Sequence, residues 1–194
     1  MRQIINNGLK EKQLKNMKQN VSCGFVSEDA KIGKGTIIKI GAIIEEDCVI
    51  GRNCFIGYHA VLRKGTKIGD NSVFGTLSVS EGFNKIGSNT TIHSQNHITQ
   101  TVEIGDCVFI APFFCGANTK SIVHGRNLEL KKEGYRIKFG ARIAIGVFVL
   151  PDITIGREAF IGVGSLVTKD IPDFAIAYGS PAKVMGKVPE NERL

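Results

Sequence analysis

The sequence predicts an all-β protein: a left-handed parallel β-helix of about seven turns, with one protruding loop and a short C-terminal tail. The first observation behind this prediction is a six-residue repeat that runs in one phase over 26–115 and resumes in a new phase over 137–172. The second is the spacing of the apolar residues, which recur every six positions and not at the three and four positions of a helix. The third is the composition, because 194 residues with 23 Gly and no Trp suit one domain with a long, thin core. The period of six favours the left-handed form, an exception to the usual right-handed crossover.

The repeat is clearest over 44–73, which reads IEEDCV, IGRNCF, IGYHAV, LRKGTK and IGDNSV. The first position of each unit is an Ile or Leu that should face inward, and the fifth is a small residue where the interior narrows. The fourth position needs a residue that accepts a left-handed backbone at low cost, and Gly, Asn, Asp and His do so best. A turn role is therefore expected at each of these fourth positions, which are Asp47, Asn53, His59, Gly65 and Asn71.

Three regions follow one another along the chain. We expect an N-terminal basic segment over 1–25, the β-helix over 26–172 with a loop at 116–136, and a C-terminal tail over 173–194. The first region carries much of the net charge of +7, but it has no interleaved aromatic residues, so a solvated or subunit-contacting segment is expected and a nucleic-acid arm is not. A long connection inside a compact repeat is usually functional and has to project from the coil.

The cysteines predict the compartment. There is no CxxC pair, and Cys48 and Cys54 occupy the small inward position, so packed free thiols in a reducing compartment are expected. No apolar run is long enough for a membrane helix and the N-terminus lacks a signal-peptide core, which together predict a cytoplasmic protein without a membrane span. The five cysteines are Cys23, Cys48, Cys54, Cys107 and Cys115.

Two irregularities in the repeat mark candidate sites. The unit at 80–85 (SEGFNK) keeps its length but loses its pattern, and the polar unit IHSQNH follows soon after with His93, Asn96 and His97. A polar turn with a hydrogen-bonded Asn explains the second unit, and so does a functional site, because two histidines and two amides converge there. His124 in the loop belongs either to a mobile surface segment or to a ligand-covering loop.

The end of the chain brings in a family resemblance. Residues 155–187 read IGREAFIGVGSLVTKDIPDFAIAYGSPAKVMGK, which closely resembles the closing segment of hexapeptide-repeat acyltransferases. This motif is not specific for the acceptor, and within the family the chain as a whole is most similar to sugar and nucleotide-sugar acetyltransferases. The resemblance implies acetyl-CoA as acyl donor, a sugar or nucleotide-sugar acceptor for a surface glycan, and a homotrimer with active sites between neighbouring prisms. It also implies a coenzyme A site in which Gly146, Gly164 and Ser165 offer close backbone approach while Lys169 and Lys183 supply cations to the phosphates.

The resemblance leaves two candidates for the catalytic base. In the branch similar to nucleotide-sugar N-acetyltransferases the key polar residue lies on a turn before the loop, which points to His97 with Asn96 and His93 orienting. In the branch similar to galactoside and maltose O-acetyltransferases a loop histidine is the base, which points to His124. We favour the first branch, with the amino group of a nucleotide-linked amino sugar as acceptor and no metal.

Two other classes stay open. A zinc enzyme like the γ-type carbonic anhydrases shares the prism and uses three histidines across a subunit cleft, for which His59, His93 and His97 are the candidates. A prism can also serve as a scaffold without catalysis.

Overall fold

The computed structural model describes residues 24–194. The expected basic segment over 1–25 lies almost wholly outside the described residues, and so does Cys23. Among the residues described, no helix has the length and apolar character needed to cross a membrane. Cys48, Cys54, Cys107 and Cys115 are free thiols, and the first two are buried as expected.

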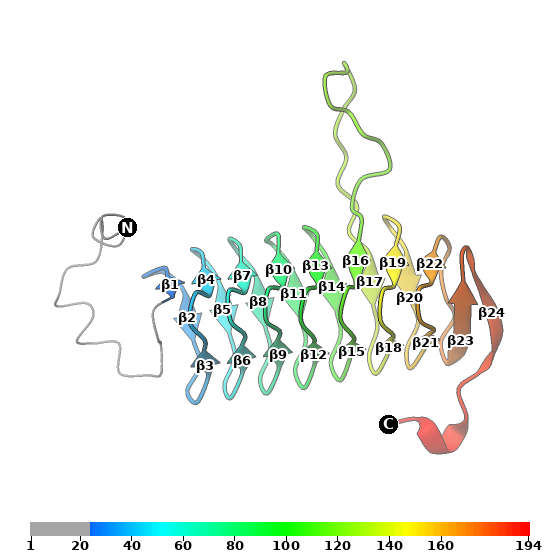
Figure 1. The fold of residues 1–194 in the computed structure, drawn as a ribbon, viewed down its shortest axis with the longest axis horizontal. Helices are drawn as coiled ribbons and strands as arrows, with labels where there is room; N and C mark the ends of the chain where they lie inside the picture. Colours follow the sequence, from blue (N-terminus) through cyan, green and yellow to red (C-terminus); the bar gives the residue numbers. More distant parts are fainter. Residues whose placement is uncertain (1–23) are drawn as a thin grey trace.

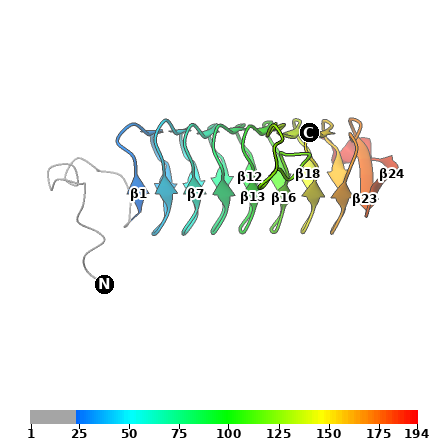
Figure 2. The same ribbon diagram turned by 90° about the horizontal axis from the view of Figure 1, so that it is seen from above.

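The chain winds into the predicted left-handed parallel β-helix, in which evenly stacked turns build three parallel sheets (Figures 1 and 2). Sheet 1 runs in the order β1 (Phe25–Val26), β4 (Ile43–Ile44), β7 (Val61–Leu62), β10 (Val79–Ser80), β13 (His97–Ile98), β16 (Cys115–Gly116), β19 (Phe148–Val149) and β22 (Leu166–Val167). Sheet 2 runs in the order β2 (Lys31–Ile32), β5 (Val49–Ile50), β8 (Lys67–Ile68), β11 (Lys85–Ile86), β14 (Glu103–Ile104), β17 (Arg136–Ile137) and β20 (Thr154–Ile155). Sheet 3 contains β3 (Ile37–Ile38), β6 (Phe55–Ile56), β9 (Val73–Phe74), β12 (Thr91–Ile92), β15 (Phe109–Ile110), β18 (Arg142–Ile143) and β21 (Phe160–Ile161).

The coil is slightly longer than predicted, with about eight turns. The reason lies in the tail, whose strand β23 (Ala175–Gly179) continues sheet 3 by pairing parallel to β21. The chain then reverses into β24 (Ala182–Lys187), which pairs antiparallel to β23, and ends in a short 3-10 helix, η1 (Glu190–Glu192). The tail is therefore part of the stack at its C-terminal end.

Three corners join the sheets, and we name them 1/2, 2/3 and 3/1 after the sheets they connect. The left-handed backbone predicted at the fourth positions is present, with φ between 52° and 58° at Asn53, His59 and Asn71. The same conformation recurs at each turn because a two-residue strand leaves only a short corner in which to change direction. The 3/1 corner, which matters below, carries a stack of left-handed residues: Gly41, His59, Leu77, Gln95, Phe113, Gly146 and Gly164.

The interior follows the repeat. The second residue of almost every strand points inward and is buried, as the Ile and Leu pattern predicts. The irregular unit at 80–85 is an exception with a physical cause. Ser80 replaces the large apolar residue, and its buried hydroxyl lies 2.9 Å from Thr66 Oγ1 and accepts a hydrogen bond from Asn84 Nδ2 at 2.8 Å. Because these buried polar groups are hydrogen-bonded to one another, the unit keeps its place in the coil.

The outward faces differ in character. Sheet 1 presents an apolar row that includes Phe25, Ile43 and Phe148, interrupted by His97. Sheet 2 presents mainly charged residues from Lys31 to Arg136. The outward face of sheet 1 is therefore more apolar than that of sheet 2.

Candidate active site

The centre of the candidate site is His97, at the start of β13 in sheet 1. Its side chain points outward and is 42% exposed. Its Nε2 lies 3.2 Å from Oε1 of Glu81, which follows β10 one turn earlier. A carboxylate at this distance accepts the Nε2–H bond and leaves Nδ1 free to take a proton, which is the arrangement of a histidine general base.

The sequence analysis missed Glu81. The signal was available, because residues 18 apart stack directly in this coil, as Val79 does on His97, and Glu81 lies two positions after Val79. A comparison of units three apart would have found the pair.

Cys115 lies on the other side of His97, since the two are partners in the register of β13 and β16. Burial raises the pKa of the Cys115 thiol, and the negative charge of Glu81 raises it further. The thiol therefore stays protonated near neutral pH and is not an activated nucleophile.

His93 follows β12 and is exposed on the approach to the 3/1 corner. Its ring packs edge-on against Phe109, with ring centroids 5.3 Å apart and an interplanar angle of 68°. The structure thus brings His93 and His97 onto the same turn, on the two sides of one corner.

Asn96 does not fit the predicted orienting role. It is 2% exposed and its amide is used inside the coil: Nδ2 donates to the carbonyl of His93 at 2.9 Å, and Oδ1 accepts from the N–H of Phe114 at 2.7 Å. The alternative reading of a polar turn with a hydrogen-bonded Asn describes this residue correctly.

The loop lies between β16 and β17 and projects far from the coil (Figure 1). Its base is tied by Lys120, whose Nζ lies 2.7 Å from Glu133 and 3.2 Å from Asp152. His124 is exposed near the tip, where its carbonyl accepts a hydrogen bond from Arg126 Nη1 at 2.8 Å. Within one chain the structure does not bring His124 to His97.

The residues expected to hold coenzyme A separate into two groups. Gly146 and Gly164 lie in the 3/1 corner at φ of 69° and 65°, and a Cβ added to either would have no neighbour within 4 Å. Ser165 is fully buried, donates to the carbonyl of Gly162 at 2.6 Å and accepts from the N–H of Gly179 at 3.2 Å, so its side chain serves the coil.

The two cations expected at the phosphates lie at opposite edges of sheet 1. Lys183 pairs with Tyr178 in the β23–β24 hairpin, whose tip stacks over Ser165 at the 3/1 corner. Lys169 follows β22 on the side of the 1/2 corner. One ligand laid along the 3/1 corner of a single chain therefore reaches Lys183 before Lys169.

The zinc alternative finds no support within one chain. His59 is in the left-handed turn conformation, two turns of the stack before Gln95, and about 5 Å separates neighbouring turns. No group of three His, Cys, Asp or Glu residues able to hold a metal occurs among residues 24–194.

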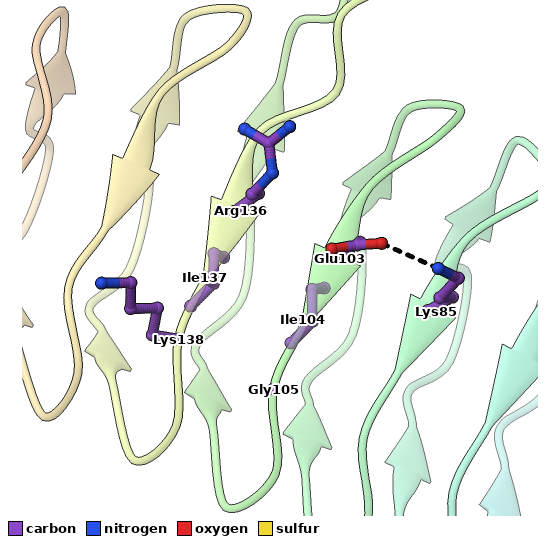
Figure 3. A pocket seen from close by; sticks show the side chains of 7 residues that line it. All are labelled: Lys85, Glu103, Ile104, Gly105, Arg136, Ile137 and Lys138. Atoms are coloured by element: carbon purple, nitrogen blue, oxygen red, sulfur yellow. Dashed lines mark hydrogen bonds and ion pairs between the residues drawn. The ribbon is translucent and has the colours of Figure 1, made fainter.

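A shallow depression on sheet 2 contains none of the predicted residues (Figure 3). Its charged groups are paired: Lys85 Nζ donates to Glu103 Oε1 at 2.9 Å, and this hydrogen bond lowers the pKa of Glu103. Arg136 and Lys138 face Asp152 and Asp173 at 3.8 and 3.4 Å. The charges are satisfied within the face, which makes this depression a poor candidate for the site.

Comparisons with known proteins agree with the fold and the repeats. Residues 29–64 match the family described as bacterial transferase hexapeptide (six repeats). The chain is 39% identical over 99 residues to galactoside O-acetyltransferase of Escherichia coli K12, a match that covers 48% of this chain and 47% of the relative. It is 46% identical over 52 residues to dTDP-3-amino-3,6-dideoxy-alpha-D-galactopyranose 3-N-acetyltransferase of Aneurinibacillus thermoaerophilus, which covers 27% of each chain.

Among solved structures, a galactoside acetyltransferase in complex with coenzyme A matches with a TM-score of 0.54 and 30% identity, covering 68% of this chain and 66% of that one. The chain spans about half or less of the length of the curated relatives named here. The matching repeats, the three-sided coil and these relatives agree. In its repeats and its coil the chain therefore resembles the hexapeptide-repeat, left-handed β-helix acyltransferases.

Proposed function

We propose that this protein transfers an acetyl group from acetyl-CoA to a sugar, with His97 as the general base. The observation that carries the proposal is the His97–Glu81 pair at 3.2 Å on the outward face of sheet 1. Among the described residues His97 is the histidine with a carboxylate partner within 4 Å, which distinguishes it from His93 and His124. A histidine oriented by a carboxylate is suited to proton transfer near neutral pH.

The chemistry follows from this geometry. The acceptor oxygen or nitrogen attacks the thioester carbonyl while His97 Nδ1 takes its proton, and Glu81 stabilises the imidazolium that forms. The tetrahedral intermediate collapses with cleavage of the carbon–sulfur bond. The proton then passes from His97 to the departing thiolate, so that free coenzyme A and the acetylated sugar are the products.

The 3/1 corner is the proposed place of the acetyl-CoA. Gly146 and Gly164 leave the left-handed position of this corner without a side chain for two turns, next to the exposed apolar side chains of Ile145 and Val163. Lys183 lies at the C-terminal end of the corner, where a cation suits a pyrophosphate. The relative solved with coenzyme A supports the choice of donor. His97 lies on the adjoining sheet 1, in an earlier turn of the stack.

We further propose that the working form is a trimer in which sheet 1 packs against a different face of the next copy. Exposed apolar residues such as Phe25, Ile43 and Phe148 line this sheet, whereas charged residues are depleted from the centres of interfaces. A contact between two different faces closes into a ring when the rotation fits. His97 then lies in the cleft between two copies.

Two acceptors are proposed. The amino group of a nucleotide-linked amino sugar is the first, supported by the N-acetyltransferase relative. A sugar hydroxyl is the second, supported by the longer match to galactoside O-acetyltransferase. With a hydroxyl acceptor the loop offers another base, since its exposed Ile122 and Leu128 suit burial against a second copy, which would carry His124 into that copy's cleft.

The test is mass spectrometry of products formed from acetyl-CoA with a panel of nucleotide-linked amino sugars and simple hydroxyl sugars. We expect a mass gain of one acetyl group on an acceptor of the panel. His97→Ala should lower the turnover number by a factor on the order of 10² or more, with His124→Ala as the matched variant. The reverse ranking moves the base to the loop, and absence of product from every acceptor contradicts the proposed activity.

Glu81→Gln separates a positioning role from a structural one. The amide keeps the size of Glu81 but no longer stabilises the imidazolium, so the pH at which turnover reaches half its maximum should move and the melting temperature should not. An unchanged pH profile would remove Glu81 from the mechanism.

A further inference from the structure

The residue stack at the 3/1 corner contains an abrupt change of side-chain size. Phe113, 52% exposed, is followed one turn later by Gly146 and two turns later by Gly164. At the far end the tip of the β23–β24 hairpin brings Tyr178, 48% exposed, over Gly162. At its left-handed position the corner thus offers a strip without side chains between two aromatic residues, about 15 Å long for three steps of the stack. The exposed side chains of Ile145 and Val163, one position before each glycine, border this strip.

The charges beside the strip decide in which direction an acyl-CoA would lie along it. Lys183 is the register partner of Tyr178, so the cation lies at the Tyr178 end. The phosphates of an acyl-CoA belong at that end, and the thioester then points toward Phe113. The turn that carries His93 and His97 comes directly before the turn of Phe113, which agrees with this direction.

The side chains of left-handed corner residues lean back over the preceding turn. A Cβ added to Gly41 would meet the ring of His59, and one added to Gly65 would meet the ring of Phe83 at 2.8 Å. The same lean carries the Phe113 ring away from Gly146 and over the turn of Gln95, which is the histidine turn. A large aromatic residue with φ of 63° is uncommon.

We infer that Phe113 closes the acyl end of this strip and restricts the donor to short acyl chains. The inference rests on the proposed use of acyl-CoA and adds a specificity-determining residue to it. An acetyl group ends before the Phe113 ring. Each further methylene of a longer acyl chain has to displace that ring. A binding site of this kind discriminates between ligands by about ten-fold or more in affinity for each group that does not fit.

The test is calorimetric titration of coenzyme A, acetyl-CoA and hexanoyl-CoA into the full chain, which needs no acceptor. In the unaltered protein we expect hexanoyl-CoA to bind at least about ten-fold more weakly than acetyl-CoA. Phe113→Ala should bring the two affinities to within about three-fold of each other by removing the ring. Phe83→Ala is the matched control, because Phe83 is 55% exposed with φ of 54° but lies in the 1/2 corner, and it should leave the ratio unchanged.

The outcomes separate the two proposals. If the unaltered protein binds none of the three ligands, the proposed function fails. If it binds acetyl-CoA but Phe113→Ala leaves the ratio of affinities as it was, only the present inference is overturned. Light scattering adds a further arm: a shift of Phe113→Ala to monomer with an unchanged ratio assigns Phe113 to the subunit contact and overturns the acyl role.

Discussion

At the scale of single residues, the interior position of Asn96 decides its role. In the coil, the fifth position of each unit meets the backbone of the turn above and the turn below. Ser78 fills it one turn earlier, where its hydroxyl donates to the carbonyl of His93 and accepts from the N–H of Asn96. Asn96 performs the same task one turn later and bridges His93 to Phe114. The polar run that suggested a site therefore combines one structural residue with two outward histidines.

Asn96→Val should destabilise the fold, because the buried N–H of Phe114 would lose its partner, while the carbonyl of His93 would keep the hydrogen bond from Ser78. A cost of about 1–3 kcal/mol is expected for the unsatisfied N–H of Phe114, measured as the free energy of unfolding in denaturant. Asn96→Ser is the control, since a serine hydroxyl already bridges turns at position 78, and it should cost less. Equal unfolding curves for both variants and the unaltered protein would contradict this account.

Tyr135 predicts a pH effect on stability. It returns the chain from the loop to β17, is fully buried and packs edge-on against Phe114 at 5.6 Å. Its hydroxyl faces Thr99, but neither hydroxyl makes a hydrogen bond of ordinary geometry. Burial, followed by the charge of Cys115, raises the pKa of Tyr135 well above its usual value.

The sign of the effect follows from that shift. The folded state keeps Tyr135 neutral, so its contribution is fully present below the unfolded pKa of about 10 and is lost as the pH rises above it. Tyr135→Phe should therefore be at least as stable as the unaltered protein at pH 7, and its advantage should grow above pH 10. Unfolding in denaturant from pH 7 to 11 measures this. A constant difference across that range would show that Tyr135 ionises normally.

At the scale of elements, the repeat phase predicted the strands and corners well, because a two-residue strand with an inward second residue leaves little freedom. The loop was also predictable as a break in the phase. Which residues of different turns lie near one another was harder to predict from the sequence. The sequence places Lys169 and Lys183 close together, yet they lie at opposite edges of sheet 1, because the chain passes through β23 and reverses before it reaches Lys183.

That separation predicts unequal effects of the two lysines. Lys183→Ala should raise the KM for acetyl-CoA several-fold with little change in kcat, because Lys183 adjoins the 3/1 corner proposed to hold the acetyl-CoA. Lys169→Ala, at the other edge, should raise KM less. Steady-state kinetics at varied acetyl-CoA measures both. A larger KM effect for Lys169 would place the phosphates on the 1/2 corner, and an effect of Lys183 on kcat alone would contradict a phosphate role.

At the scale of the whole molecule, the contrast between apolar sheet 1 and charged sheet 2 was not apparent from the sequence, because the first residues of successive strands belong to different faces. Only the assignment of every third strand to one sheet sorts them. Once sorted, Val49 is an apolar residue between Lys31 and Lys67 on sheet 2, and Ile43 belongs to the apolar row of sheet 1.

Ile43→Lys and Val49→Lys form a matched pair for the proposed trimer, since the two side chains are 40% and 38% exposed in the single chain. Ile43→Lys places a charge in the proposed interface and should shift the mass measured by light scattering toward the monomer. Val49→Lys should leave the mass unchanged. Dissociation by Val49→Lys, with Ile43→Lys silent, would assign the interface to sheet 2.

The stacking of residues 18 apart also has a consequence for how this chain tolerates change. Lys85 and Glu103 are joined across one turn, as are Arg52 and Asp70, while neighbours in sequence mostly point to different sides of the coil. Compensating substitutions therefore pair positions one full turn apart, and after the loop the partner of Glu103 becomes Arg136. We expect the coil to tolerate insertions at its corners. The loop is an example, because β17 after it still pairs with β14.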